Sequence, residues 1–241
     1  MKIRLLAFAS ASDAVGGSEL ELELPEGATV GDLKERLERD HAALAGLWHR
    51  VAVAVDGELA QDSTALADGA EVALLPPVSG GCGEASGVVP AVEITESPLD
   101  VDGVAARVAG PDCGALVVFV GTVRDRHHGR PVERLGYTAY RPMALVRMRR
   151  IAGDLERSFA GTRVALVHRL GTLEPGVASV VIAVASPHRD AAYQASRQAL
   201  ERLKAEVPIW KREHYAGGAA AWREEEVLAR PGSGGYPSPP R

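Results

Sequence analysis

Residues 19–24 read Glu-Leu-Glu-Leu-Glu-Leu, a strict alternation of charged and apolar side chains. Because successive side chains of a strand point to opposite faces, this stretch predicts a strand with one buried and one solvated face. The preceding stretch, Lys2 to Phe8, also alternates, so we expect the two to pair as antiparallel strands. A helix follows, because Thr29 and Asp32 form a capping box ahead of an apolar stripe that starts at Leu33.

Two further strands complete this first module. Val51 to Val55 and Glu71 to Leu75 are apolar enough for buried strands, and Asp56-Gly57 marks a turn. Two strands, one helix and two strands predict a small α+β sheet crossed by a helix. The module ends in Pro76-Pro-Val-Ser-Gly-Gly81, where two prolines stiffen the chain and two glycines leave it without side chains. Such a tail can thread a narrow channel.

Length and charge favour two domains. The 241 residues are 46% hydrophobic, enough for two separate cores. Residues 1–81 hold 6 Lys and Arg against 14 Asp and Glu, a net charge of −8, whereas residues 82–241 hold 21 against 18, a net charge of +3. Opposite charge favours contact between the modules, although an acidic surface can also serve solubility alone. We expect domains at 1–81 and 91–225, a linker at 82–90 and a disordered tail at 226–241.

Several classes of protein are excluded. Neither a long apolar run nor a secretory leader is found, which indicates a cytoplasmic protein with no membrane contact. Cys82 and Cys113 are too few for a disulfide scaffold, and the seven histidines lack metal-ligand spacing, so we expect no metal. His127-His128 is interpreted as part of a polar loop. The basic residues 147–150 indicate a solvated helix face, so we expect no nucleic acid partner.

The second domain is predicted to alternate strands and helices. In chain order we expect a strand near Val92, a helix from Ser97 to Gly110, a strand Leu116–Val123, a charged loop Arg124–Arg130, a strand Val132–Tyr140, a helix Pro142–Phe159, strands Arg163–His168 and Ser179–Ala185, and a helix from Ser186 to Val207 that Pro208 ends.

Five separated motifs in residues 91–225 resemble the large, catalytic subunit of molybdopterin synthase. They are Phe119-Val-Gly-Thr-Val-Arg124-Asp, Tyr140-Arg-Pro-Met143, Val167-His168-Arg169-Leu-Gly171, Ser186-Pro-His188-Arg189 and Leu203-Lys204-x3-Pro208-Ile-Trp210-Lys211-x-Glu213. Residues 1–81, ending in Gly80-Gly81, resemble the small subunit of that family, although carriers for thiamine synthesis and tRNA thiolation share this fold and tail. The resemblance implies an α+β chain: an N-terminal ubiquitin-like β-grasp domain followed by an α/β hammerhead-like catalytic domain.

The same resemblance implies an enzyme of molybdenum cofactor biosynthesis, a sulfurtransferase. Such a synthase converts a cyclic pyranopterin monophosphate to molybdopterin with two sulfurs, each supplied as a thiocarboxylate on a carrier's terminal glycine. It binds no permanent cofactor. Its partners are an adenylating, ubiquitin-activating-like enzyme and a sulfur donor, and its catalytic subunits form a homodimer. The alternative is a sulfur-carrier or docking protein without catalytic activity of its own.

Lys204 and Lys211 are the candidate catalytic residues. Residues 82–241 contain 19 Arg and only these two Lys. In so Arg-rich a sequence two retained lysines indicate that an amine is needed, because an ammonium can lose its proton when desolvated and a guanidinium cannot. Lys204 lies in the last turn of a predicted helix and Lys211 just beyond Pro208, so the chain can bring both to one pocket. The alternative is two solvated lysines at a helix end.

Arg124, His188 and Arg189 are the candidate substrate-binding residues. The substrate and the sulfur donor are both anions, which fixed positive charge and the unpaired N–H groups of a helix N-terminus attract. His188 and Arg189 follow the predicted helix start at Ser186-Pro187, and Arg124 ends a buried strand at a loop. A surface ion pair is the alternative for each arginine.

Four residues are of second rank. Phe119 is most simply a core residue, although the family places this aromatic near the entering carrier tail. Glu213 can orient Lys211 or pair with its arginine neighbour. His168 and Arg169 end a strand and can be structural.

Gly81 continues into Cys82, whereas a sulfur carrier must present a free glycine carboxylate to its activating enzyme. We therefore predict a protease that cuts between Gly81 and Cys82, in a stretch whose small residues suit proteolysis. Self-cleavage through the Cys82 sulfur is a less favoured route. Alternatively the chain stays uncut, and residues 1–81 form an inert plug while another carrier acts in trans.

Overall fold

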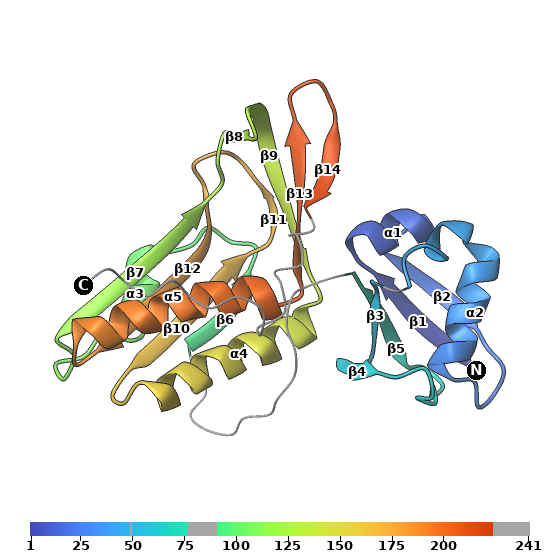
Figure 1. Ribbon diagram of the computed structural model, residues 1–241, viewed down its shortest axis with the longest axis horizontal. Coiled ribbons are helices and arrows are strands. Elements are labelled where there is room, and N and C mark those ends of the chain that lie inside the picture. Colours follow the sequence, from blue (N-terminus) through green and yellow to red (C-terminus); the bar gives the residue numbers. More distant parts are fainter. Residues whose placement is uncertain (49, 77–90, 224–241) are drawn as a thin grey trace, which may run out of the picture.

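The computed structural model describes residues 1–48, 50–76 and 91–223, which form two mixed α/β halves that lie side by side (Figure 1). The predicted Gly80-Gly81 terminus, the linker 82–90 and the tail 226–241 all lie outside the described residues. Within the described ranges, no helix is both long enough and apolar enough to cross a bilayer.

The elements of the first half are, in chain order, β1 (Lys2–Ala7), α1 (Ala9–Val15), β2 (Glu19–Glu23), α2 (Val30–Asp40), the 3-10 turn η1 (Ala42–Leu44), β3 (Ala52–Val55), β4 (Glu58–Ala60) and β5 (Glu71–Leu75). They form one sheet in the order β2-β1-β5-β3-β4. β1 and β5 pair in parallel at its centre, and the other neighbours are antiparallel. Leu33 and Leu37 of α2 pack into the sheet's own core. The predicted β-grasp arrangement is confirmed.

Local signals account for most of this half. Thr29 caps α2 by accepting from the Asp32 N–H while Asp32 accepts from Thr29, which is the predicted capping box. Asp56 and Gly57 have φ of 50° and 88°, as a two-residue hairpin turn between β3 and β4 requires. The prediction that the first two strands follow each other directly is wrong, because the seven-residue helix α1 lies between them. This helix ends at Gly16, whose φ of 77° is the left-handed conformation common at helix C-termini.

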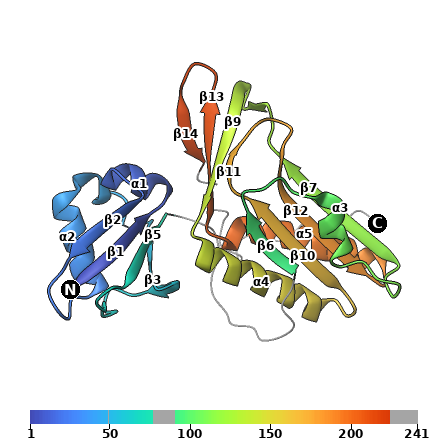
Figure 2. The ribbon, with the colours of Figure 1, turned by 180° about the vertical axis from the view of Figure 1, so that it is seen from behind.

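The elements of the second half are, in chain order, β6 (Ala91–Thr95), α3 (Val101–Ala106), β7 (Ala115–Thr122), β8 (Arg126–His127), β9 (Arg130–Ala139), α4 (Arg141–Ser158), β10 (Arg163–Arg169), β11 (Gly171–Leu173), β12 (Ala178–Ser186), α5 (Arg189–Glu206), β13 (Ile209–Tyr215) and β14 (Ala220–Arg223). A four-stranded sheet runs in the order β6-β10-β12-β7. Helices α4 and α5 cover one face around a core of buried aliphatic side chains, and the short α3 packs on the other (Figure 2).

Two predicted helix starts are displaced. Asp100, not Ser97, caps α3, because its carboxylate accepts from the Gly103 N–H. His188, not Ser186, is the N-cap of α5, because Ser186 is still the last residue of β12 and its hydroxyl accepts from buried Thr162.

A second sheet of this half joins β11, β9, β13 and β14, with β8 paired to β9. Strands β13 and β14 were not predicted, and the charged loop expected at Arg124–Arg130 contains the short hairpin of β8. The sheet stands on the side of the second half that faces the first (Figure 1). Lys211 is therefore held in a regular strand rather than in a loop after α5.

The two halves share an apolar cluster. Ala54, Ala73 and Leu75 on one face of the first sheet pack with Tyr140, Met143 and Trp210 of the second half. We call Tyr140, Met143, Trp210 and Trp222 the docking surface.

Polar contacts flank this cluster. The Tyr140 hydroxyl donates to Glu71 Oε1 at 2.9 Å, and Trp222 Nε1 donates to Asp13 Oδ2 at 3.0 Å. Burial, followed by the Glu71 carboxylate, raises the pKa of Tyr140 well above its ordinary value, so this hydroxyl keeps its proton for the bond. Acidic side chains of the first half thus accept hydrogen bonds from uncharged donors of the second.

Candidate active site

Strand β13 presents different side chains to its two sides. Trp210 stacks on Phe8, and Arg212 Nη1 lies 4.0 Å from Asp13, so these two residues face the first half. Because side chains alternate along a strand, Lys211 and Glu213 occupy the opposite face. Lys211 is therefore adjacent to the docking surface in sequence but on the far side of the strand.

Lys211 pairs across the sheet with a tyrosine that contacts buried polar side chains. In the antiparallel register it is opposite Tyr137 of β9, and opposed residues project to the same face. The Tyr137 hydroxyl donates to Ser179 Oγ at 3.4 Å, and its ring meets that of His168 edge-on with centroids 5.1 Å apart. Both His168 and Ser179, which Tyr137 contacts, are buried from water.

His168 is uncharged at neutral pH. Complete burial lowers its pKa to about 4, although its bond with the Arg169 carbonyl opposes this. Nδ1 lies 2.9 Å from that carbonyl, which can only accept, so the proton is on Nδ1. Arg169 donates from Nε to the Glu96 carbonyl at 3.0 Å and so fastens β10 to the end of β6. These contacts favour structural roles for both residues.

Lys204 lies exposed in the last turn of α5. The helix ends at Glu206, the chain turns at Pro208, and β13 starts one residue later. The Pro208 carbonyl accepts from the Tyr140 N–H at 3.2 Å, which fixes this turn beside the docking surface. Both lysines consequently lie at the same end of the four-stranded sheet.

Arg124 belongs to that same end. Thr122, the last residue of β7, pairs with Ala178, the first residue of β12, and Arg124 follows two positions later. Because α5 runs back along β12, its C-terminal turn with Lys204 returns to this end of the sheet. Arg124 and Lys204 thus lie toward the same end of the four-stranded sheet, the end from which the chain continues into β13 with Lys211.

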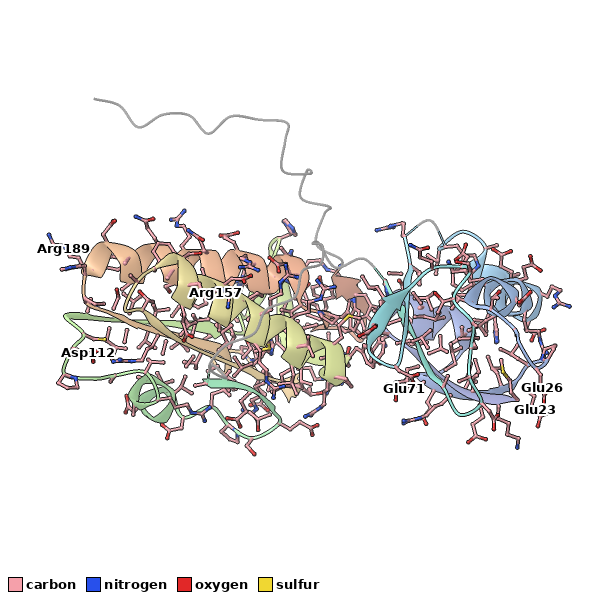
Figure 3. All side chains as sticks on the ribbon, turned by 90° about the horizontal axis from the view of Figure 1, so that it is seen from below. Glu23, Glu26, Glu71, Asp112, Arg157 and Arg189 are labelled. Carbon is pink, nitrogen blue, oxygen red and sulfur yellow. The ribbon has the colours of Figure 1, made fainter. Side chains whose placement is uncertain are left out.

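His188 and Arg189 lie at the opposite end. They start α5, whereas Lys204 is fifteen residues further along it, which corresponds to about 22 Å of helix. Figure 3 shows Arg189 at the end of the second half that is remote from the first. Within one chain these two residues cannot share a pocket with the lysines.

The structure shows the contacts of two second-rank residues, Phe119 and Glu213. Phe119 packs against the core between the sheet and α5. Glu213 is buried; its Oε1 lies 2.9 Å from His127 Nδ1, and its other oxygen accepts from the Tyr215 hydroxyl. Neither His127 nor Tyr137 was predicted from the sequence to belong to the site. The predicted strand Val132–Tyr140 does contain Tyr137, but nothing local indicates that this strand pairs with residues 209–215.

The described residues hold no group of three or more His, Cys, Asp or Glu side chains placed to bind a metal ion.

Comparison with known proteins identifies both halves. Residues 94–206 match the family described as MoaE protein, and residues 5–81 match the ThiS family. The chain is 48% identical over 132 residues to a molybdopterin synthase catalytic subunit of Pyricularia oryzae, covering 55% of this chain and 72% of that one. It is 47% identical over 135 residues to molybdopterin synthase catalytic subunit 1 of Mycobacterium tuberculosis, covering 56% and 92%.

A solved structure agrees with these relatives. The crystal structure of molybdopterin synthase from Staphylococcus aureus superposes with a TM-score of 0.53 at 38% identity, covering 55% of this chain and 96% of that one. Since the similarity spans 92% of the Mycobacterium tuberculosis relative and 96% of the Staphylococcus aureus chain, this chain belongs to the molybdopterin synthase catalytic subunit family, with a ThiS-family sulfur-carrier domain fused in front of it.

Proposed function

We propose that the chain is a complete molybdopterin synthase, with carrier and catalyst encoded together. It converts a cyclic pyranopterin monophosphate to molybdopterin by accepting two sulfurs. Each sulfur arrives as the thiocarboxylate of a carrier's terminal glycine, which is left as a carboxylate. No permanently bound cofactor takes part, and the reaction belongs in the cytoplasm.

One observation carries this proposal: the carrier domain packs against β13, the strand that holds Lys211. Leu75, the last residue of β5, packs in the same cluster as Trp210, the neighbour of Lys211. Gly81 is six residues beyond Leu75, which an extended chain spans in at most about 20 Å. A glycine thiocarboxylate at that position therefore has the reach to cross to the face of β13 that holds Lys211.

The residues divide the chemistry between them. Lys204 and Lys211 supply amines that transfer protons, or bond transiently to the carrier carbonyl, as sulfur leaves. Arg124 supplies a fixed charge for the substrate phosphate. Phe119 packs under this end of the sheet and has no direct part. A docking protein without activity would need none of these amines.

A second copy of the chain would complete the site. β7 is an edge strand of its sheet, and three apolar side chains that alternate along it are exposed: Leu116, Val118 and Val120, at 46%, 36% and 36%. Unpaired edges with apolar side chains favour pairing with another strand.

The geometry of such pairing matches the separated residues. Antiparallel pairing of two β7 strands about a two-fold axis brings the start of one beside the end of the other. His188 and Arg189 lie near the start of β7, since Ser186 pairs with Ala115. Arg189 of the partner subunit would then lie toward Arg124 and Lys204. A homodimer thus supplies the phosphate-binding charge that one chain lacks near its lysines.

The carrier must be loaded with sulfur at its terminal glycine before it can act. We propose an adenylating, ubiquitin-activating-like enzyme and a sulfur donor as partners, and a protease that cuts after Gly81 to free its carboxylate. The carrier half has a separate core, so it can fold as a released domain.

The direct test incubates purified protein with the cyclic pterin monophosphate and with residues 1–81 carrying a Gly81 thiocarboxylate. Molybdopterin should form, and should not form when the carrier bears an ordinary carboxylate. Binding of the carrier without any product would instead favour the docking protein.

A further inference from the structure

Glu213 is a buried carboxylate close to the proposed site. Only 5% of its surface is exposed. His127 Nδ1 lies 2.9 Å from Oε1, and the Tyr215 hydroxyl donates to Oε2. Burial of a carboxylate is unfavourable unless charge and hydrogen bonds compensate it, so His127 and Tyr215 together make this position possible.

The hairpin of β8 and β9 determines where His127 points. His128 and Gly129 have φ of 46° and 77°, the two left-handed residues that a type I′ turn requires. The turn sets His127 opposite Arg130, and the Arg130 guanidinium lies 3.8 Å from the centre of the Tyr215 ring. Both residues that flank the turn therefore contact the same face of β13.

The segment held in this way carries Arg124. On one side of Arg124, the N–H of Val123 donates to the Val177 carbonyl at 3.0 Å. On the other, the Asp125 carbonyl accepts from the Val132 N–H at 2.8 Å. The hairpin that contains this second bond is joined to β13 through His127. Glu213, the β13 residue that contacts His127, is two residues from Lys211 on the same face of the strand.

We propose that His127 and Glu213 are positioning residues that hold the Arg124 segment in register with Lys211. The proposal rests on the function proposed above, in which Arg124 binds the substrate phosphate and Lys211 acts on the sulfur-bearing centre. Without the pair, β9 stays in its register on β13, but the β8 arm of the hairpin, which leads back to Arg124, is no longer tied to Glu213, and a bound phosphate no longer places the pterin beside the amine. A merely structural contact would change stability but not substrate binding.

The experiment compares three variants of the full chain. His127→Ala removes the pair. His127→Asn keeps it, because the amide nitrogen of Asn takes the place of Nδ1. His128→Gly is the matched control, since it removes the adjacent imidazole and suits the left-handed turn. Folding of each is checked by circular dichroism, and kinetics are measured with the cyclic pterin monophosphate and thiocarboxylated residues 1–81.

We expect His127→Ala to raise KM for the pterin roughly ten-fold with a smaller change in kcat, since it disturbs placement and not chemistry. His127→Asn and His128→Gly should stay near the wild type. An unchanged KM in folded His127→Ala, or an equal rise in His128→Gly, overturns the proposal.

A second readout separates this inference from the proposed function. Hydrogen exchange of residues 125–132 should quicken in His127→Ala alone, whether or not the wild type makes molybdopterin. Equal exchange in all variants overturns the positioning role, while absence of product from the wild type counts only against the proposed function.

Discussion

The indole of Trp210 stacks on the ring of Phe8, with centroids 4.9 Å apart and planes inclined by 16°. Phe8 follows the first strand of the carrier, and Trp210 precedes the candidate catalytic Lys211. One aromatic pair therefore connects recognition of the carrier to the strand that holds the amine.

We expect this pair to be the main anchor of docking. Aromatic residues in the centre of an interface commonly contribute roughly 2 kcal/mol or more, so Trp210→Ala should weaken binding of separate residues 1–81 to residues 82–241 at least about 30-fold. Tyr140→Phe, which loses only the bond to Glu71, should weaken binding by roughly 1 kcal/mol. Titration calorimetry measures both. Equal, small effects would show that the stack does not anchor the carrier.

We expect arginine to be unable to replace Lys204 or Lys211 in catalysis. Lys204→Arg should nearly abolish molybdopterin formation, because charge is kept while the removable proton is lost, and Lys211→Arg should impair turnover equally or less. Lys34→Arg in the carrier is the matched control, since Lys34 forms an ion pair with Asp62 and should tolerate the change. Single-turnover assays measure the rate at which each variant forms molybdopterin. Normal turnover in both catalytic-half variants would contradict the role of an amine.

We expect Arg189 to bind the phosphate group of the substrate. Arg189→Ala should raise the pterin concentration needed for half-maximal rate, and the effect should shrink for an analogue without the phosphate. Equal loss of affinity for both ligands would show that Arg189 does not bind that group.

Mixed dimers test where Arg189 acts. If it serves the lysines of the partner subunit, co-expressed Arg189→Ala and Lys204→Arg chains recover about a quarter of the wild-type activity, because each mixed dimer has one intact site. If Arg189 served its own chain, mixing would recover nothing. Activity is measured at a pterin concentration far below that which half-saturates Arg189→Ala, where neither homodimer should show appreciable activity, and is compared with that of each homodimer alone.

Stability should depend on pH through His168. Its pKa is lowered to about 4 in the folded chain from an ordinary 6.5, so between these values the unfolded chain binds a proton that the folded chain does not. The free energy of unfolding should therefore fall as pH falls from 6.5 to 4, by up to about 1.4 kcal/mol per pH unit from this residue. His168→Asn should show a shallower slope in urea unfolding. Parallel slopes would contradict the assignment.

Intact mass spectrometry of protein from its native host tests the proposed cut. A fragment ending at Gly81, with a mass shift for exchange of oxygen by sulfur, is expected. Full-length chain alone in cells that make the cofactor would rule cleavage out.

Local signals in the sequence predicted much of the fold. The alternation of 19–24, the capping box at Thr29 and the turn at Asp56 each depend on a few neighbouring residues, and all are present in the structure. Helix α1 was missed because Ala-Ser-Ala-Ser has no apolar period, and it is stabilised by packing of Ala11 and Val15 into the carrier core.

The candidate site was predictable in part. Lysine scarcity singled out Lys204 and Lys211, and the predicted helix from Ser186 to Val207 already put Arg189 at its start and Lys204 in its last turn. The partnership of His127 with Glu213 was not predictable, because it joins residues 86 positions apart and depends on the pairing of β9 with β13.

Covalent fusion changes what the docking surface must achieve. While residues 77–90 connect the halves, a short link keeps the carrier at a local concentration on the order of millimolar. An interface with a dissociation constant near a micromolar would then be occupied nearly all the time, and a ten-fold loss of affinity would scarcely be felt. If the chain is cut after Gly81 as proposed, occupancy would follow the cellular concentration of the two pieces. A substitution at Phe8 or Trp210 would then have little effect in the fused chain and a large effect in the cleaved one.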